Sequence, residues 1–369
     1  MTTDEDSKDS YVTGIAQALE KNPPWPILNL SGYTIGDKVA IALADALKKN
    51  TTLHTLKLGY NSITETGVEA IAQMLTDNES LQTLNLSKNT IKDIGAEALA
   101  EALGANTTLK SLNLGDNSIT GEGVKAIAQM LKENNTTLLH IDLSKSLLLN
   151  VDTMITLQTV LLRNKKLETL VLCSSRINDV LVGYLTEALK TNTSLLHLDL
   201  SGNEIKADGA KLLAEALEKN TTLQVLNLSE NKIKDNGAEA LADGLKANTS
   251  LHTLILSYNG IGAVGAELLA KALGENKTLQ TLYFSGNDID QTGTGRTALD
   301  NVVKTRKPKL VISYMKNKKN KKSPKKTLGR KKGTKKSLGR KQRPKKPLGR
   351  KQSPKKSIGR KRQPVKKSP

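Results

Sequence analysis

LQVLNLSENKIKDNGAEALADGLKANTS, residues 223–250, decides the fold, because close copies of it recur along most of the chain. Its leucines and asparagine follow the pattern L-x-x-L-x-L-x-x-N, in units that begin 28 or 29 residues apart. Ten units are visible, and their first positions are Trp25, Leu53, Leu81, Leu109, Leu138, Leu167, Leu195, Leu223, Leu251 and Leu279. One unit of this length cannot bury its own apolar face, so the units are expected to stack.

Each unit combines two periodicities. The L-x-L step has a period of two, which predicts a short strand, whereas Val68, Ile71, Ala72 and Leu75 have the three-to-four spacing of a buried helix face. Stacked units of this kind place parallel strands on an inner concave surface and helices outside, with an aliphatic core between the layers. The sequence therefore predicts an α/β fold, a right-handed solenoid shaped like a horseshoe.

Two further positions recur in each unit. The helix is expected to end at an asparagine, which tolerates the left-handed conformation found beyond helix C-termini. These asparagines are Asn50, Asn106, Asn192, Asn220 and Asn248. A glycine recurs at the helix entrance, where the missing Cβ would let the helix and strand layers approach closely. These glycines are Gly67, Gly95, Gly123, Gly209, Gly237, Gly265 and Gly293.

The boundaries of the repeats divide the chain into four expected segments. Residues 15–22 (IAQALEKN) match 71–78 (IAQMLTDN), so residues 1–24 are predicted to hold the helix of a partial repeat that covers the first strand. Residues 25–306 hold the ten repeats. Residues 307–315 are predicted to form a terminal capping strand whose Lys307, Pro308 and Lys309 discourage another strand from adding. Residues 316–369 form a Lys/Arg-rich tail.

The repeat motif resembles the leucine-rich repeats of the ribonuclease-inhibitor class, which also form the sensor arm of NOD-like receptors. The resemblance covers about four fifths of the chain and implies the horseshoe fold. It does not imply a particular function, because unrelated functions share this scaffold. NOD-like receptors carry a nucleotide-binding module before such repeats, and only 24 residues precede the repeats here.

Charge is distributed unevenly between the repeats and the tail. Residues 316–369 hold 26 of the 56 Lys and Arg residues and no acid, which leaves 30 basic against 36 acidic residues elsewhere. Such a tail favours nucleic acid or another anionic surface as its partner.

The single cysteine, Cys173, excludes a disulfide framework within one chain, and no apolar stretch predicts a secretory signal or a bilayer span. We therefore expect an intracellular protein without integral membrane contact, in the nucleus rather than the cytoplasm.

The tail itself repeats every ten residues or so. Low apolar content predicts that it is disordered alone. SPKK at 323–326 and at 353–356 resembles the units of linker-histone tails, which in that family bind DNA. The residues expected to contact DNA or RNA are Lys325, Lys326, Arg330, Lys335, Lys336, Arg340, Lys345, Lys346, Arg350, Lys355, Lys356 and Arg360. Ser323 and Ser353 precede proline and are candidate phosphorylation sites that would lower the local charge. A nuclear import signal alone, or attachment to an acidic membrane or protein, remains an alternative.

The concave face is the candidate protein-binding surface, because side chains between the strand leucines point into it. Its predicted contact residues are Tyr60, Lys88, Asp116, Asp142, Asp199, Glu230, Tyr258 and Tyr283. His140 and Asp142 share an H-x-D spacing with His197 and Asp199. We interpret both pairs as products of one repeat position, since no third ligand or nucleophile accompanies them.

The fifth and sixth repeats depart from the pattern. Spacings of 29 residues separate Leu109, Leu138 and Leu167. In the fifth and sixth repeats Ser146 and Ser175 replace the recurring asparagine of the motif, and the helix-entry glycine is missing. The consecutive residues Leu147, Leu148 and Leu149, together with Cys173 and Arg176, form a possible apolar partner-binding patch. Relaxed drift of the repeat is the alternative.

Motifs of catalysis are missing from the sequence. It contains neither a phosphate-binding loop with lysine and serine or threonine, nor H-E-x-x-H, nor a nucleophile with a credible base. We predict a non-enzymatic, monomeric scaffold without cofactor or metal, which binds a protein on its concave face while the tail localises the complex. The alternative is a protein that binds or compacts nucleic acid through the tail, with the repeats as an anchor. The identity of the protein partner, and the choice between DNA, RNA and another polyanion, stay open.

Overall fold

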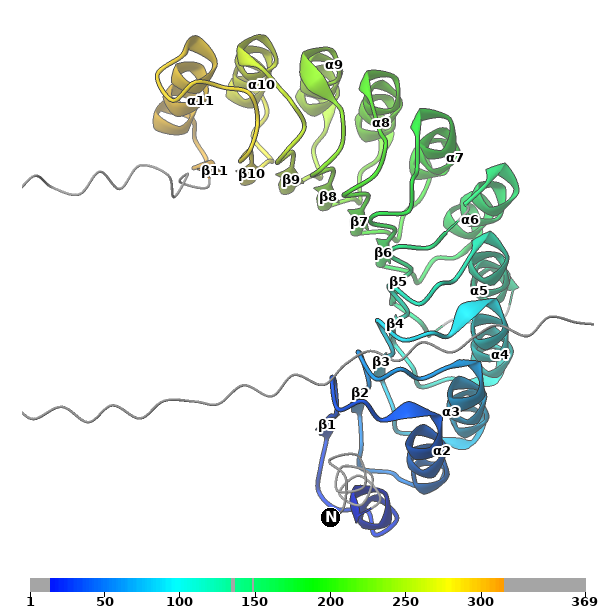
Figure 1. Cartoon of the computed structure of the whole chain (residues 1–369). Helices are drawn as coiled ribbons and strands as arrows, with labels where there is room; N and C mark the ends of the chain where they lie inside the picture. The colour runs from blue at the N-terminus through cyan, green and yellow to red at the C-terminus, as the bar shows by residue number, and fades with distance from the viewer. Residues whose placement is uncertain (1–13, 134–136, 148, 315–369) are drawn as a thin grey trace, which may run out of the picture. The chain divides into compact units, whose positions relative to one another are not determined.

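The computed structural model describes residues 14–133, 137–147 and 149–314, which contain the repeats. The chain divides into two units, Met1–Lys316 and Asn317–Pro369, and the repeats belong to the first. Stacking of the repeats produces a curved array in which strands line the inner, concave face and helices form the outer, convex face (Figure 1). The predicted α/β solenoid is therefore confirmed. The tail predicted over residues 316–369, with its basic residues and both serines, lies outside the described residues.

The strands form one parallel sheet of eleven strands in chain order, each strand three residues long. They are β1 Ile27–Asn29, β2 Thr55–Lys57, β3 Thr83–Asn85, β4 Ser111–Asn113, β5 His140–Asp142, β6 Thr169–Val171, β7 His197–Asp199, β8 Val225–Asn227, β9 Thr253–Ile255, β10 Thr281–Tyr283 and β11 Val311–Ser313. The register pairs equivalent positions of neighbouring repeats, so that Leu56 lies between Leu28 and Leu84. Each position of the repeat therefore forms a row along the solenoid.

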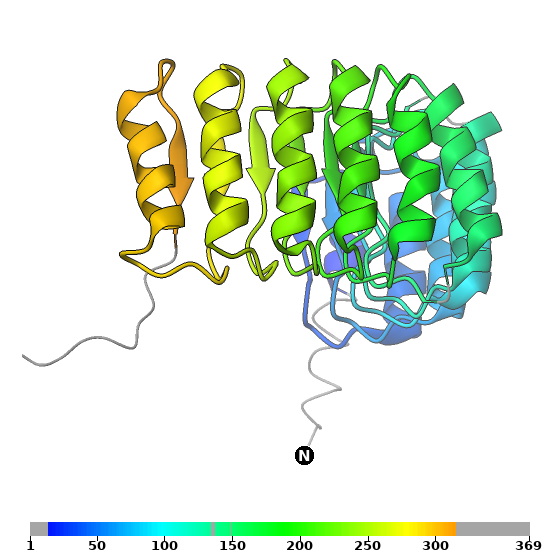
Figure 2. The same ribbon diagram turned by 90° about the horizontal axis from the view of Figure 1, so that it is seen from above.

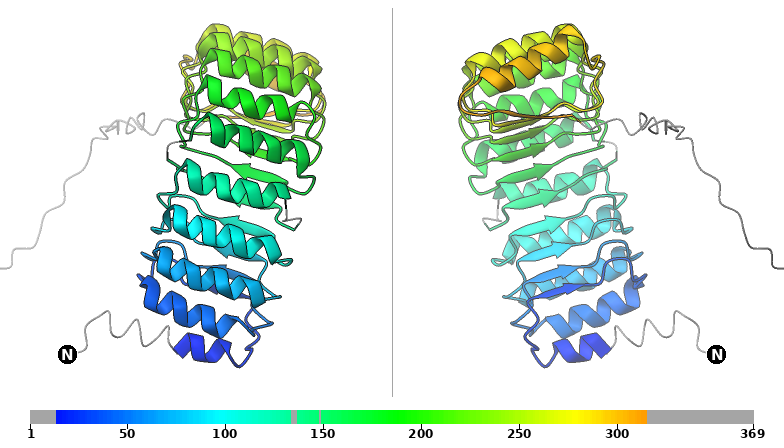
Figure 3. Two further views of the ribbon diagram at one scale, coloured as in Figure 1. Left: turned by 90° about the vertical axis from the view of Figure 1, so that its right-hand side faces the viewer. Right: turned by 90° about the vertical axis from the view of Figure 1, so that its left-hand side faces the viewer.

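The helices pack side by side in the same order (Figures 2 and 3). They are α2 Gly36–Leu47, α3 Glu65–Asp77, α4 Lys92–Ala105, α5 Gly121–Glu133, α6 Val151–Arg163, α7 Asp179–Leu189, α8 Ala207–Lys219, α9 Lys234–Ala247, α10 Ala263–Glu275 and α11 Thr294–Thr305. Residues 14–19 form a further helical stretch before β1, with Ala16 and Leu19 buried. No helix among the described residues has both the length and the apolar character that crossing a bilayer requires.

One continuous aliphatic core lies between the two layers. The strand leucines and the inner helix residues, such as Leu56 and Leu75, are fully buried. Each buried leucine contributes about 1.5–3 kcal/mol relative to an exposed one. The helix-entry glycine lets neighbouring helices approach: a Cβ on Gly67 would lie 2.5 Å from the carboxylate oxygen of Asp37 on the preceding helix. The close approach predicted for this glycine is therefore present, but it faces the neighbouring repeat rather than the strand layer.

The prediction for the helix-terminal asparagines was wrong in conformation. Asn248 is extended, with φ −71° and ψ 133°, rather than left-handed. Its amide nitrogen donates to the carbonyl of Leu217 in the preceding repeat at 2.7 Å, and its amide oxygen accepts from the backbone N–H of Leu251 at 2.8 Å. The same pair of contacts recurs at Asn50, Asn78, Asn106, Asn164, Asn192, Asn220 and Asn276. An extended backbone lets one side chain join two repeats, which explains why asparagine recurs here.

Aspartates of the first, third, sixth and eighth repeats connect to the helix start of the following repeat. The Asp37 carboxylate accepts from the backbone N–H groups of Thr64 at 2.7 Å and Gly67 at 3.1 Å, at the start of the next helix. Asp93, Asp179 and Asp235 make the equivalent contacts. A carboxylate at a helix N-terminus satisfies free N–H groups and interacts favourably with the helix dipole. These carboxylates are therefore occupied in joining repeats.

Candidate functional site on the concave face

Three residues after each strand from β1 to β10, the backbone adopts a left-handed conformation with φ between 55° and 78°. We call these residues the left-handed row; they are Gly32, Tyr60, Lys88, Asp116, Lys145, Ser174, Gly202, Glu230, Tyr258 and Gly286. From Gly32 to Tyr258, the backbone N–H of each residue of the row donates to a carbonyl of the next repeat, as from Tyr60 to Ser87 at 2.9 Å. Inter-repeat hydrogen bonds therefore impose this conformation, whichever residue occupies the position.

Residues other than glycine have a strained backbone at these positions. The left-handed conformation costs about 1–2 kcal/mol for a residue with a Cβ, and glycine avoids this cost. Seven positions of the row nevertheless carry a side chain. At position 286, glycine is also favoured sterically, because a Cβ added there would lie 2.2 Å from the ring of Tyr258. The row thus presents a line of exposed or half-buried side chains at a conformational cost that glycine would remove.

Neighbouring side chains of the row contact one another across repeats. The Lys88 ammonium lies 4.7 Å from the centre of the Tyr60 ring, a cation–π contact. The Lys145 ammonium lies 2.6 Å from a carboxylate oxygen of Asp116. The hydrogen bond and the charge of Asp116 raise the pKa of Lys145. Because both partners are exposed, this ion pair orients the side chains more than it stabilises the fold.

A shallow depression of about 250 Å³ lies beside the row in the third to sixth repeats. Lys88, Asp116, Asp142, Lys145 and Cys173 are among the residues that line it. Two of the predicted contact residues, Lys88 and Asp116, therefore lie together with a third, Asp142. Lys145, which is not one of those predicted contact residues, occupies the same repeat position as Lys88.

The remaining predicted contact residues lie along the same face. Asp199 accepts hydrogen bonds from Ser201 N at 2.8 Å and from Asn227 Nδ2 at 2.8 Å, so much of its hydrogen-bonding capacity is already used. Asp142 similarly accepts from Ser144 N at 2.9 Å. Glu230 is exposed. Three tyrosines, Tyr60, Tyr258 and Tyr283, are 65%, 49% and 41% exposed. The face therefore offers aromatic side chains in the second, ninth and tenth repeats, with polar and charged residues between them.

Cys173 and His140 lie on the concave side of the sixth and fifth repeats. Burial raises the pKa of the Cys173 thiol, and the charges of Asp199 and Asp142 raise it further, so the thiolate is disfavoured at neutral pH. His140 Nδ1 lies 2.9 Å from the hydroxyl of Thr169. Among the residues that the structure describes, no group of three or more His, Cys, Asp or Glu side chains is placed to hold a metal ion.

The irregular repeats only partly expose the predicted apolar patch. Leu147 is 45% exposed and Arg176 is exposed, whereas Leu149 packs against the core, and Leu148 lies outside the described residues. The hydroxyl of Ser146 donates to Leu143 in its own repeat, at 2.6 Å. The patch therefore remains a prediction, centred on Leu147 and Arg176.

The asparagine of the repeat motif shows what Ser146 lacks. At the equivalent position of the third repeat, the Asn89 side chain accepts from the N–H groups of Asn61 and Ile63 in the preceding repeat, both at 3.0 Å. A serine side chain is shorter, and in this structure that of Ser146 bonds within its own repeat. The ladder of asparagines is therefore interrupted at the fifth repeat.

Comparison with known proteins agrees with this architecture. The leucine-rich repeat family model ("Leucine Rich repeat") matches residues 49–72, 77–100, 105–128, 191–214, 219–242, 247–270 and 275–293. The chain folds as a leucine-rich-repeat solenoid. The family model does not match residues 129–190, the stretch that holds the fifth repeat and most of the sixth. A comparison with curated proteins found no match.

Several solved leucine-rich-repeat structures resemble parts of the solenoid. Leiomodin-1 actin-binding site 2 is 27% identical, with 44% of this chain and 91% of that chain covered and a TM-score of 0.38. The tropomodulin C-terminal domain of Caenorhabditis elegans is 14% identical, with 42% and 92% covered and a TM-score of 0.37. Rad7, from its complex with Elc1 in yeast, is 14% identical, with 82% and 87% covered and a TM-score of 0.41. The ribonuclease-inhibitor subclass remains a prediction.

Proposed function

We propose that this leucine-rich-repeat protein is a non-enzymatic scaffold that binds a protein partner on its concave face. Leucine-rich-repeat proteins are generally binding scaffolds of this kind. The observation that carries the proposal is the left-handed row, in which seven side chains occupy strained backbone positions that glycine would occupy without strain. Strain of this kind is found at functional sites, where the surrounding structure maintains it.

The side chains of the row indicate the kind of protein surface that would fit. Lys88 and Lys145 lie beside Asp116 and Asp142 in the depression, so a partner would present both acidic and basic groups there. Tyr60 and Tyr258, in the second and ninth repeats, are aromatic anchors of the type found at interface hot spots. Binding through a few tyrosines and exposed charges gives an interface of modest affinity in which charge sets the orientation.

For the tail we propose a second, electrostatic contact that localises the complex in the nucleus. Support comes from its 26 Lys and Arg residues and its two SPKK units. A tail that makes ~6–10 phosphate contacts would lose roughly 10³–10⁵ in affinity between 50 and 200 mM salt. Tail-driven binding or compaction of nucleic acid, with the repeats as an anchor, is the alternative.

Site-specific photo-crosslinking tests the concave face. A benzophenone amino acid is placed at Tyr60 or Tyr258 and, as matched controls, at the exposed helix positions Ile94 and Val264 on the convex side. We expect a protein partner to be crosslinked from the concave positions and not from the convex ones. Equal crosslinking from both sides would contradict the proposal. Repeating the experiment without residues 316–369 separates the alternatives, since a scaffold keeps its partner and a tail-driven protein does not.

A further inference from the structure

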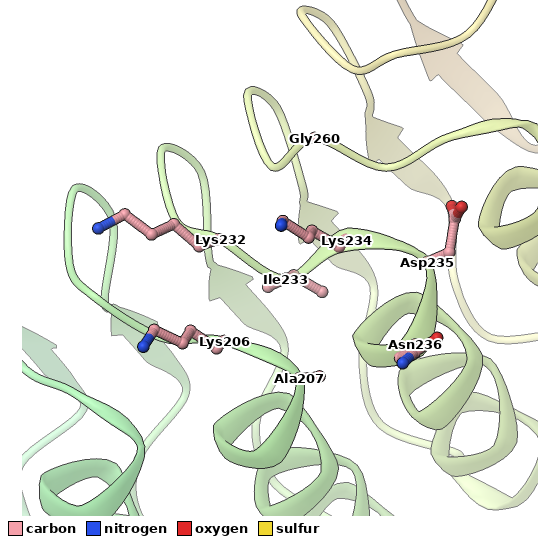
Figure 4. A pocket seen from close by; sticks show the side chains of 8 residues that line it. All are labelled: Lys206, Ala207, Lys232, Ile233, Lys234, Asp235, Asn236 and Gly260. Atoms are coloured by element: carbon pink, nitrogen blue, oxygen red, sulfur yellow. The ribbon is translucent and has the colours of Figure 1, made fainter.

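A second cavity, of about 440 Å³, lies between the seventh and eighth repeats, outside the concave depression. It is lined by the loops that enter α8 and α9 and by Gly260 of the ninth repeat. Lys206, Lys232 and Lys234 are among the residues that line it, while the side chain of Asp235 points away toward the next repeat (Figure 4). The cavity therefore gathers three lysines from two successive loops.

Among the described residues, no carboxylate forms an ion pair with any of the three lysines. Asp235 is the acid that lines the cavity, but its carboxylate accepts from the backbone N–H groups of Gly262 at 2.6 Å and Gly265 at 3.0 Å. Three lysines that line one cavity repel one another unless an anion lies between them.

The same position of another repeat shows how this charge is otherwise compensated. Lys92 corresponds to Lys234: each is the first residue of its helix and has a left-handed φ of 57° or 56°. The Lys92 ammonium pairs with Glu65, the first residue of the preceding helix, at 3.2 Å. At that position before Lys234 the chain has Ala207. The exchange of glutamate for alanine removes the counter-charge, and Ala207 lines the cavity.

We propose that this cavity, the lysine pocket, binds a phosphate group on a side chain of the protein partner. A compact dianion suits a cavity lined by three lysines, since charge-assisted contacts to phosphate are among the stronger hydrogen bonds. A nucleic-acid strand fits less well. No aromatic side chain for base stacking lines the pocket, and the exposed acids Glu204 and Asp208 flank Lys206 in the sequence. The inference rests on the proposed scaffold function, because it identifies a chemical feature of the partner.

Lysine acetylation footprinting on the full chain tests the pocket, with mass spectrometry reading each lysine separately. The probes are inorganic phosphate, a phosphoserine peptide and its unphosphorylated form, at matched ionic strength. We expect phosphate and the phosphopeptide to protect Lys206, Lys232 and Lys234 more than Lys271, an exposed lysine of α10. Protection that is no greater than at Lys271, or that is equal with the unphosphorylated peptide, would overturn the proposal. So would stronger protection by a single-stranded oligonucleotide than by the phosphopeptide.

A substitution inside the pocket provides the matched variant. Ala207→Glu introduces the glutamate that pairs with the lysine in the third repeat, so we expect about tenfold weaker protection by the phosphopeptide. Lys271→Ala is the control and should leave protection unchanged. If Ala207→Glu fails to fold, Lys232→Gln provides the same test, because its side chain is exposed. Unchanged protection in the folded variant would refute the pocket.

Failure of the lysine pocket and failure of the scaffold proposal give different results. Loss of crosslinking at the concave tyrosines, with phosphate-dependent protection retained, would remove the scaffold and leave a phosphate-binding pocket. Crosslinking at Tyr60 and Tyr258 without protection of the three lysines would leave the scaffold and remove the pocket.

Discussion

Asn248→Ala is expected to destabilise the solenoid by about 3–5 kcal/mol, because one side chain joins two repeats. The Asn248 amide donates to Leu217 O at 2.7 Å and Asn220 O at 3.1 Å. It accepts from Ser250 N at 3.1 Å and Leu251 N at 2.8 Å. At about 1 kcal/mol net for each of these four bonds, the loss is about 4 kcal/mol, in the middle of this range.

Two measurements check this estimate. Urea unfolding followed by circular dichroism gives the loss of stability, and amide hydrogen exchange reports the N–H of Leu251, which loses its acceptor. Asn236→Ala on the exposed side of α9 is the matched control and should change stability by less than about 0.5 kcal/mol. A loss below about 1 kcal/mol for Asn248→Ala, with unchanged exchange at Leu251, would show that the asparagine ladder does not hold the repeats together.

Three other substitutions and labels test the geometry. Ser146→Asn should restore an acceptor for backbone N–H groups of the fourth repeat. It should raise the free energy of unfolding by about 1 kcal/mol, measured by urea unfolding. A lower urea midpoint would contradict the account of the interrupted ladder. Gly286→Ala should destabilise more than Gly32→Ala, since both have positive φ but only the former would meet the Tyr258 ring, and equal urea midpoints would contradict this. Cys173 should react with iodoacetamide about tenfold more slowly in the folded than in the unfolded chain at pH 7.5, and faster as pH rises, because burial raises its pKa; equal rates would exclude that cause.

The fold could be predicted from the sequence because the repeat supplies its own comparison. Leucines in a period of two and aliphatic residues at helical spacing identify the strand and the helix in every unit, and stacking follows from the need to bury both faces. The strand register needs no further information, since Leu28, Leu56 and Leu84 occupy the same position of successive repeats. No catalytic motif in the sequence suggested a different fold.

Backbone conformation was harder to predict, because in this solenoid it is set by the neighbouring repeat. Asparagine suggested a left-handed helix end at Asn248, yet the residue is extended. Tyr60 and Glu230 carry no such suggestion, yet both are left-handed, because their N–H groups donate to carbonyls of the next repeat. Residue preferences describe isolated segments, whereas inter-repeat hydrogen bonds decide these two positions.

The ion pairs of the candidate sites were not predicted for a related reason: they form between positions in adjacent repeats. Lys145 meets Asp116 across 29 residues, and Lys92 meets Glu65 across 27. Read along the chain, Ala207 is an unremarkable helix residue. Compared with Glu65 in the equivalent position, it marks the loss of a counter-charge beside Lys234. In a solenoid, a candidate site of this kind forms between two neighbouring repeats. It becomes visible when one pair of neighbouring repeats is compared with another pair at the same two positions, and it is not visible in the sequence of a single repeat.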